Sequence, residues 1–174
     1  GDLWFPIDDK VRIGELDFIY EHDSLDNAWF PTAGMRHRLD YRYATSGMGS
    51  ASDFQQAIAI GSFAFSHGKN TFLLNYEGGY SFDERSPVER WFQLGGLGRL
   101  SGLGPNQLTG RNIAVSTLAY YRRLNELDLL RAYAGFTLEA GNVWDRREDI
   151  RFNDLRYSAS IYVGADTPIG PVYF

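Results

Sequence analysis

Apolar and polar side chains alternate along most of this chain. In the stretch MRHRLDYRYATS (35–46), the odd-numbered positions are apolar or aromatic apart from His37, whereas the even-numbered positions from Arg36 to Arg42 are all charged. Successive side chains of a β-strand point to opposite faces. The segment is therefore predicted to be a strand with one apolar face and one ionic face.

The same period of two recurs along the rest of the sequence, although Ile19 interrupts the polar face of the first segment. The pattern predicts about eight strands, no helix and an antiparallel all-β fold. The clearest further segments are 15–21, 71–82, 131–144 and 155–166, the less regular ones are 53–67 and 112–124, and 170–174 is a stub.

Three observations favour a transmembrane β-barrel over a soluble barrel or sandwich, whose strands also alternate. The segments are long enough for a tilted transmembrane strand of ~9–11 residues, whereas a typical soluble strand has ~5–6. Aromatic side chains such as Trp29, Tyr80 and Trp144 gather near segment ends, as interfacial girdles require. Small residues also occur on the apolar face, which lipid tolerates better than a filled core. A soluble ligand-binding β-barrel remains the alternative.

Composition narrows the classes of function. The chain has 174 residues and no cysteine, which excludes disulfides, thiolate metal sites and cysteine nucleophiles. A net charge of -5, with scattered Lys and Arg, argues against a nucleic-acid partner. No apolar run approaches the ~20 residues of a membrane-spanning helix. The start, GDLWFPIDDK, lacks the features of a signal peptide, and the chain is consistent with an internal fragment of a longer protein.

The glycine-rich stretch FQLGGLGRLSGLGPNQLTG (92–110) invites comparison with phosphate-binding loops. Such loops need G-x-G-x-x-G, or a terminal Lys-Ser/Thr, between a strand and a helix. Here Gly96, Gly98 and Gly102 are spaced G-x-G-x-x-x-G, no lysine follows, and the next segment alternates as a strand. A nucleotide cofactor is therefore not expected.

No other motif supplies catalytic or metal chemistry. Asp23 and Asp26 in HDSLDN are oxygen donors, but the flanking residues offer too few ligands for calcium. Asp and Asn beside FPTAG are more typical of a capped hairpin turn. The three histidines lack metal-ligand spacing, and neither Ser50 nor Ser101 lies in G-x-S-x-G. We expect no catalytic residue, no cofactor and no metal in this segment.

Three stretches agree with known motifs in order and spacing from about residue 11 to 174. YEHDSLDNAWFPTAGMRHRLDY looks like D-x-x-D-N-x-x-F-P-x-x-G. WFQLGGLGRLSGL resembles F-x-L-G-G-x-x-x-L-R-G-Y, with LSGL in place of L-R-G-Y, and LEAGNVW with DTPIGPVYF resembles D-A-G-N-V-W and T-P-I-G-P-L. The chain thereby resembles the bacterial surface antigen superfamily, the outer-membrane barrels related to the BamA-type assembly factor. The motif positions are Asp23, Asp26, Pro31 and Gly34 in the turn; Phe92, Leu94, Gly95, Gly96, Arg99, Leu100, Ser101 and Gly102 in the loop; Glu139 and Gly141 on the wall; and Thr167, Pro168, Gly170 and Pro171 in the closing strand.

The resemblance implies a long extracellular loop that folds back into the lumen with its tip against the inner wall. In many members a loop-tip Arg pairs with a wall Asp, but here these positions are Ser101 and Glu139. We expect Arg99 or Arg111 to supply the missing cation. A solvated lumen, in which Glu139 needs no partner, is the alternative. The polar lumen lining is expected to include Glu15, Asp17, Arg36, Arg38, Asp40, Arg42, Glu77, Arg131, Arg156 and Asp166.

Within the superfamily, the stretches LSGL, QLTG and YYRRL are most similar to the barrel that follows a patatin-like phospholipase domain in single-chain secretion proteins. This similarity implies a sixteen-stranded barrel in the bacterial outer membrane. Residues 1–10 would be a lead-in, and residues 11–174 the C-terminal half, truncated in the last strand. Two exposed sheet edges would leave this half without function alone.

The expected function is translocation or anchoring of a passenger, with any Ser/Asp lipase chemistry in an upstream domain. The expected partners are outer-membrane lipids, the barrel assembly machinery, the protein's own N-terminal barrel half and its passenger; pairing into a homodimer is left open. An assembly factor or a two-partner secretion transporter, built on the same barrel with several upstream periplasmic domains, is the alternative within the superfamily.

Overall fold

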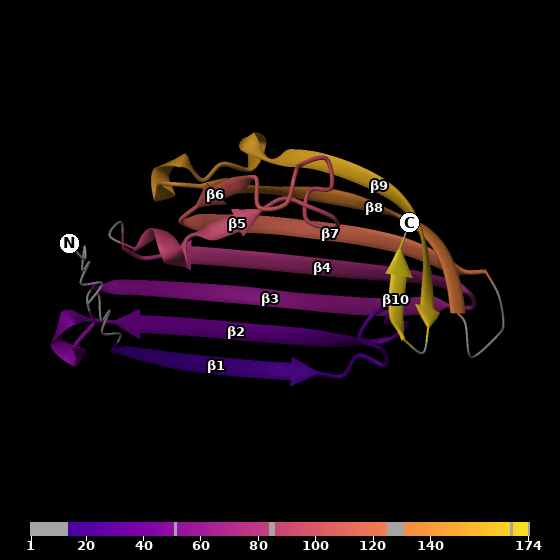
Figure 1. The fold of residues 1–174 in the computed structure, drawn as a ribbon, viewed down its shortest axis with the longest axis horizontal. Helices are drawn as coiled ribbons and strands as arrows, with labels where there is room; N and C mark the ends of the chain where they lie inside the picture. Colours follow the sequence, from indigo (N-terminus) through magenta and orange to yellow (C-terminus); the bar gives the residue numbers. More distant parts are fainter. Residues whose placement is uncertain (1–13, 51, 84–85, 125–130, 168, 174) are drawn as a thin grey trace, which may run out of the picture.

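The chain forms one long antiparallel sheet in a computed structural model that describes residues 14–50, 52–83, 86–124, 131–167 and 169–173. Eight strands follow one another in the order β1-β2-β3-β4-β7-β8-β9-β10, and a loop between β4 and β7 carries a separate two-stranded sheet, β5-β6 (Figure 1). The strands are β1 (Glu15–Asp23), β2 (Gly34–Ala44), β3 (Phe54–His67), β4 (Asn70–Ser81), β5 (Phe92–Leu94), β6 (Leu108–Gly110), β7 (Asn112–Arg123), β8 (Arg131–Trp144), β9 (Arg156–Thr167) and β10 (Gly170–Tyr173).

Four single-turn 3₁₀ helices lie in the described connections: η1 (Ser46–Met48), η2 (Val88–Arg90), η3 (Arg147–Asp149) and η4 (Phe152–Asp154). The eight-stranded antiparallel fold predicted from the period of two is thus confirmed. The described residues contain no helix that is both long and apolar enough to span a membrane. The predicted lead-in, residues 1–10, lies outside the described residues.

The two longest connections between the strands, 82–111 and 145–155, lie at the same end of the sheet. The connection 45–53 lies there too, and we call this the loop end; 24–33, 68–69 and the β9–β10 turn lie at the other, the turn end. Outer-membrane barrels have long extracellular loops and short periplasmic turns. The loop end therefore corresponds to the extracellular side.

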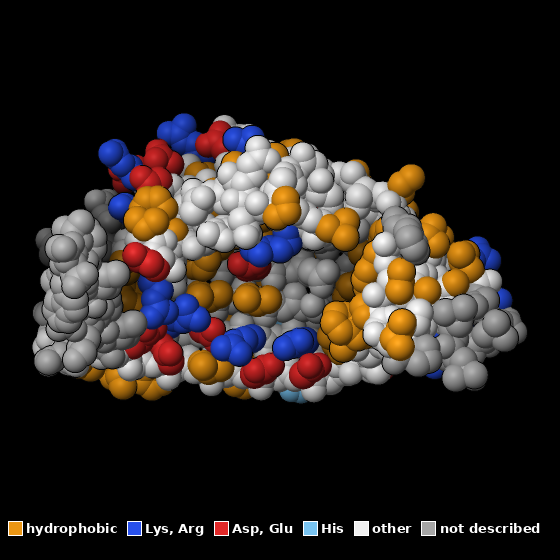
Figure 2. Space-filling model, in the orientation of Figure 1, with side chains coloured by type: hydrophobic (Ala, Val, Ile, Leu, Met, Phe, Trp, Pro, Cys, Tyr) orange, Lys and Arg blue, Asp and Glu red, His pale blue; other side chains and the backbone are white. Residues whose placement is uncertain are grey.

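The two faces of the sheet differ sharply in polarity. We call the face that carries β5 and β6 the lumen face, and the opposite one the outer face (Figure 1). Figure 2 looks onto the lumen face, which is hollowed and carries Arg, Asp and Glu side chains along β1 and β2. Large apolar side chains are exposed on the outer face, among them Phe63, Leu74, Leu138 and Ile161. A soluble ligand-binding barrel would turn its apolar face inward, so that alternative is wrong.

Two groups of aromatic rings border the outer face. Towards the loop end, Tyr41 and Phe82 have ring centroids 6.3 Å apart, and towards the turn end, Phe72 and Tyr120 have centroids 5.2 Å apart. From Phe72 to Tyr80, β4 rises roughly 27 Å at ~3.4 Å per residue. At a tilt of about 40° this rise spans roughly 21 Å of membrane, somewhat less than the ~25 Å apolar band of a membrane barrel.

Candidate functional site

The loop between β4 and β7 folds back over the lumen face. Its stem forms the short β5–β6 hairpin, which pairs Phe92 with Gly110 and Leu94 with Leu108 (Figure 1). The apolar side chains of Phe92, Leu94 and Leu100 are buried together against Ile113 and Val115 of β7, with Leu103 and Leu108 partly buried beside them. We call this loop, residues 92–110, the loop plug.

Backbone geometry explains part of the glycine content of the loop plug. Gly95 has a φ of 129°, and a Cβ there would lie 2.4 Å from the carbonyl oxygen of Gly104. Only glycine fits such a position without displacing the backbone. Leu100 also has a positive φ, 66°, a conformation that costs a non-glycine residue about 1 kcal/mol or more. Its burial at 1% exposure among the plug's apolar side chains offsets that cost.

The tip of the loop plug is bound to a carboxylate on β8. The Ser101 amide donates to Oε2 of Glu139, and the Ser101 hydroxyl donates to Oε1 at 2.6 Å. The Thr137 hydroxyl, also on β8, donates to the same Oε1 at 2.6 Å. Glu139 is 2% exposed, so these hydrogen-bond donors, rather than water, stabilise its carboxylate.

Hydroxyl groups of the neighbouring strands hold the rest of the tip. Thr117 of β7 donates to the Gly98 carbonyl oxygen at 2.7 Å, and the Gly102 amide donates to Ser158 Oγ of β9 at 2.8 Å. The Thr137 hydroxyl also contacts Ser160 Oγ at 2.6 Å. Three adjacent strands therefore bind the tip through short, uncharged side chains and one buried carboxylate.

Neither expected arginine reaches Glu139. Arg99 instead forms an ion pair of 2.6 Å with Glu77 of β4 and donates to the Gln93 carbonyl oxygen at 3.0 Å. Arg111 lies 3.7 Å from Asp145. The prediction of an arginine at Glu139 is therefore wrong, because Arg99 points across the lumen to β4 rather than down onto β8. The solvated alternative is wrong too, since Glu139 is buried and hydrogen-bonded.

Gly141, the other predicted wall residue, lies on β8 two residues after Glu139 and next to β7. It stands opposite Val115, and a Cβ on it would lie 2.7 Å from the Val115 Cβ. Gly141 thus keeps this part of the wall close-packed next to the loop plug.

The turn motif is stabilised by its own side chains. Asp26 Oδ1 accepts the amides of Thr32 and Ala33 at 2.7 and 3.1 Å, and the Thr32 hydroxyl donates to its Oδ2. Partial burial tends to raise the pKa of Asp26, but these hydrogen bonds outweigh it and leave the pKa below its ordinary value. Asp23 Oδ1 accepts the Leu25 amide at 3.0 Å. Both carboxylates thus serve the turn, and the described residues contain no cluster of three or more potential metal ligands.

A second plug, which the sequence reasoning missed, comes from this turn between β1 and β2. Phe30 is 3% exposed and stacks on Tyr133 of β8 with ring centroids 4.4 Å apart. It also meets Tyr121 of β7 edge-on at 6.0 Å, and the Tyr121 hydroxyl donates to the Pro31 carbonyl oxygen. We call residues 24–33 the turn plug. The signal in the sequence was the apolar run AWFP (28–31) within an otherwise polar turn.

Two further residues fix the shape of the turn plug. Asn27 Oδ1 accepts the amides of Trp29 and Phe30 at 2.7 and 2.9 Å, which turns the chain into the lumen. Gly34 has a φ of 100°, and a Cβ there would lie 2.1 Å from the Ser24 carbonyl oxygen. The closure at Gly34 therefore requires glycine.

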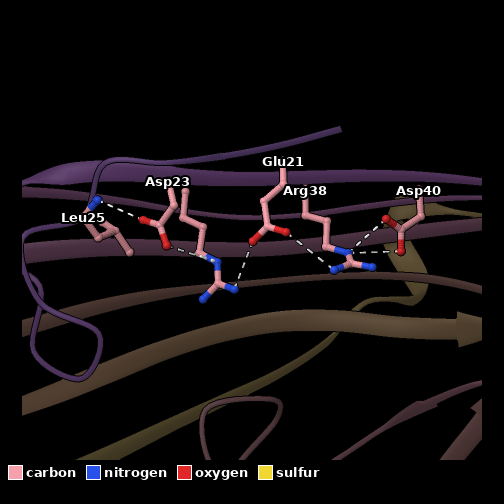
Figure 3. Close-up of polar contacts among 6 residues, drawn as sticks. Glu21, Asp23, Leu25, Arg38 and Asp40 are labelled. Atoms are coloured by element: carbon pink, nitrogen blue, oxygen red, sulfur yellow. Dashed lines mark hydrogen bonds and ion pairs between the residues drawn. The ribbon is translucent and has the colours of Figure 1, made fainter. Parts of the chain in front are cut away.

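The ionic side chains of β1 and β2 pair along the lumen face. Arg36 lies 3.4 Å from Glu21 and 3.7 Å from Asp23, while Arg38 lies 3.6 Å from Glu21 and 2.9 Å from Asp40 (Figure 3). We call this row the ionic ladder. Alternating signs let each charge neutralise its neighbours, so the wall is polar without a strong field of one sign.

A further ion pair joins β1 to the segment that precedes the loop plug. Arg90 of η2 forms a 2.6 Å ion pair with Glu15, on the edge strand β1. Arg90 also lies over the Phe54 ring, 5.2 Å from its centroid. The segment that leads into the loop plug is thus tied to the far wall of the sheet.

The closing-strand motif forms the turn into β10. The Thr167 hydroxyl donates to the Gly170 carbonyl oxygen at 2.6 Å, and Pro171 stands opposite Asp166 of β9. Pro168 lies outside the described residues. The described residues of the motif therefore position the last described strand.

Comparisons with known proteins agree with this architecture. Residues 12–174 match the model of the Omp85 superfamily domain. Among solved structures, BamA from Haemophilus ducreyi lacking POTRA domains 1-3 is similar, with a TM-score of 0.78 and 17% sequence identity. The similarity covers 92% of this chain and 37% of that one, so this chain spans well under half the length of its structural relative. No curated protein matches the chain in sequence.

The family match, the antiparallel sheet with its apolar outer face and the inward-folded loop lead to one assignment. The Omp85 barrel is a transporter or assembly fold rather than an enzyme fold. The chain belongs to the Omp85 superfamily and is part of a bacterial outer-membrane β-barrel.

Proposed function

We propose that this chain is part of the translocator or anchor barrel of a patatin-like phospholipase secretion protein. The observation that carries the proposal is the pairing of Ser101 with Glu139, where many superfamily members are expected to have Arg and Asp. Both residues of this contact differ from the Arg and Asp expected in other members, and they still bind each other. Such a matched replacement is what a distinct branch of the superfamily would carry. The LSGL, QLTG and YYRRL stretches support the same branch.

In this function the barrel inserts a passenger domain into, or through, the outer membrane and does no chemistry itself. The loop plug would keep the lumen filled while the barrel serves as an anchor. Any hydrolysis would belong to a Ser/Asp dyad in a domain upstream of Gly1. The barrel's partners would be its own N-terminal half, the assembly machinery and the passenger.

The test is serine labelling of the full-length protein on intact cells. A fluorophosphonate probe is expected to label one serine in a G-x-S-x-G upstream of this chain. Replacing that serine by Ala is expected to abolish both labelling and phospholipid hydrolysis, while the barrel still inserts. Absence of any reactive serine from the full-length protein would overturn the proposal.

An outer-membrane assembly factor is the second candidate, because the fold resembles that of BamA with a TM-score of 0.78. In that case POTRA domains, rather than a lipase, would precede the barrel. Depletion of the protein would then lower the amounts of other outer-membrane barrels. A lipase anchor would leave those amounts unchanged.

A further inference from the structure

The last described strand, β10, is weakly held by strand pairing. It is the edge of the described sheet and, with four residues, the shortest of that sheet's eight strands. Among the described strands it pairs only with β9, and the last pair places Tyr173 opposite Gly164. Pro171 has no N–H group, so it donates no hydrogen bond to this pairing. In Figure 1, β9 bends and β10 runs steeply across the direction of β1 to β4. Strand pairing alone therefore does little to fix the position of β10.

The turn plug contacts this edge strand. The centroids of the Phe30 and Tyr173 rings lie 5.2 Å apart, and Tyr173 also meets Tyr162 of β9 edge-on at 6.4 Å. The Asn27 side-chain amide donates to Oδ2 of Asp166 at 3.1 Å, in the stretch of β9 that pairs with β10. These two hydrogen-bonded residues are 139 positions apart in sequence. A turn that follows β1, at one edge of the described sheet, therefore contacts both strands at the other edge.

A glycine on β9 makes room for this contact. In the strand register, Gly164 stands between Tyr133 of β8 and Tyr173 of β10. A Cβ built on Gly164 would lie 2.7 Å from Cζ of Phe30 and 3.3 Å from Cδ1 of Tyr173. The Phe30 ring thus occupies the space where a side chain of β9 would otherwise stand, with a tyrosine on either side. Even alanine at this position would displace the ring.

We propose that the turn plug positions β10, and that Phe30 and Asn27 hold this strand where a neighbouring strand of the complete barrel can pair with it. Hydrocarbon does not satisfy free backbone N–H and C=O groups, so an edge strand of a membrane barrel must be paired. A slip of one residue would turn every side chain of the strand to the other face. Filling of the lumen explains neither the hydrogen bond from Asn27 to Asp166 nor the glycine beneath Phe30, because neither adds volume to the lumen. The turn plug therefore serves closure of the barrel as well as filling its lumen.

Hydrogen exchange of the full-length barrel in detergent micelles tests the proposal. Phe30→Leu keeps an apolar side chain in the turn plug but removes the ring that contacts Tyr173. Gly164→Ala keeps the ring and displaces it by a single methyl group. Trp29→Ala is the matched control, because Trp29 is the neighbouring aromatic residue of the same plug and is 57% exposed. Heat-modifiable migration on SDS gels checks that each variant is folded.

Exchange is followed by mass spectrometry in the peptide that contains β10, with peptides of β3 and β4 as the internal reference. Phe30→Leu and Gly164→Ala are expected to speed exchange in β10 at least fivefold, while β3 and β4 in these variants, and all strands in Trp29→Ala, keep the wild-type rate. Tyr173→Leu should have the same effect as Phe30→Leu, and the two together should add nothing further. Equal acceleration in all strands, or none in β10, would overturn the proposal. So would additive effects of Phe30→Leu and Tyr173→Leu, because the two rings would then act separately.

Discussion

The two plugs fill the same lumen with different chemistry. The loop plug enters from the extracellular end and is bound at its tip by a buried carboxylate, hydroxyls and one ion pair. The turn plug enters from the other end and is bound mainly by stacked rings around Phe30. Polar contacts depend on charge and protonation, whereas ring stacking does not. The loop plug is therefore the one that charge changes can release.

Removing the Phe30 ring should have the largest effect. Phe30→Ala leaves a cavity among Tyr121 and Tyr133 and is expected to cost about 3–5 kcal/mol of unfolding free energy. The measurement is urea unfolding of the full-length barrel in detergent micelles, followed by heat-modifiable migration. Phe152→Ala is the control, because Phe152 is 82% exposed, and it should change stability by no more than ~0.5 kcal/mol. Equal losses in the two variants would contradict an apolar turn plug.

Glu139 should rank second. Glu139→Ala leaves the Ser101 amide without its acceptor. We expect it to lower the free energy of docking of the loop tip by about 1–3 kcal/mol. Limited trypsin digestion should then cut after Arg99, which the docked loop protects. Glu139→Gln retains an acceptor oxygen and should give an intermediate rate. Unchanged protection in Glu139→Ala would show that the tip is held by something else.

The ion pair of Arg99 should contribute less, because Arg99 is partly exposed. Arg99→Glu is expected to cost about 1 kcal/mol, and Glu77→Arg in the same chain should restore it. A double-mutant cycle with Glu139 should instead be additive, because Arg99 is paired with Glu77 rather than Glu139. Strong coupling between Arg99 and Glu139, with none to Glu77, would reverse this assignment.

The turn plug has one titratable support, Asp26, whose effect should be the smallest. Its pKa is lowered in the folded turn, so its contribution is present above the ordinary carboxyl pKa of about 4 and is lost as pH falls through the folded value. Hydrogen exchange of the Thr32 and Ala33 amides should therefore quicken in acid relative to neighbouring turns. Asp26→Asn should remove this pH dependence, and an identical profile in the two proteins would contradict it.

The sequence was sufficient for the sheet but not for the contacts of its side chains. The period of two predicts strands and faces because pleating alone dictates them, and β2 follows it from Met35 to Tyr43. Pairing across the lumen depends on how far each loop reaches, which no local pattern contains. That is why Arg99 was expected at Glu139 and is found at Glu77.

Phe30 is a second case in which the local sequence does not predict a long-range contact. The side chains of Asp26 and Asn27 predict a turn, and in the structure both accept hydrogen bonds from amides of that turn. The direction in which the turn folds is set by rings on β7 and β8, about ninety residues or more away in sequence. A single sequence therefore predicts that the turn forms, but not that it enters the lumen.

Docking of the loop tip on the wall is the central claim, and a disulfide tests it most directly. The Gly102 amide binds Ser158 Oγ at 2.8 Å, and a Cβ built on Gly102 lies 3.3 Å from that atom, close enough for a disulfide. The chain has no cysteine, so Gly102→Cys with Ser158→Cys is a clean pair within this segment. In the full-length barrel the pair is expected to oxidise in the outer membrane and shift the protein's migration on non-reducing gels. Gly102→Cys with Ser62→Cys, which lies on β3, should not. Reduced thiols in the first pair, or equal cross-linking in both, would contradict a loop tip docked beside Glu139.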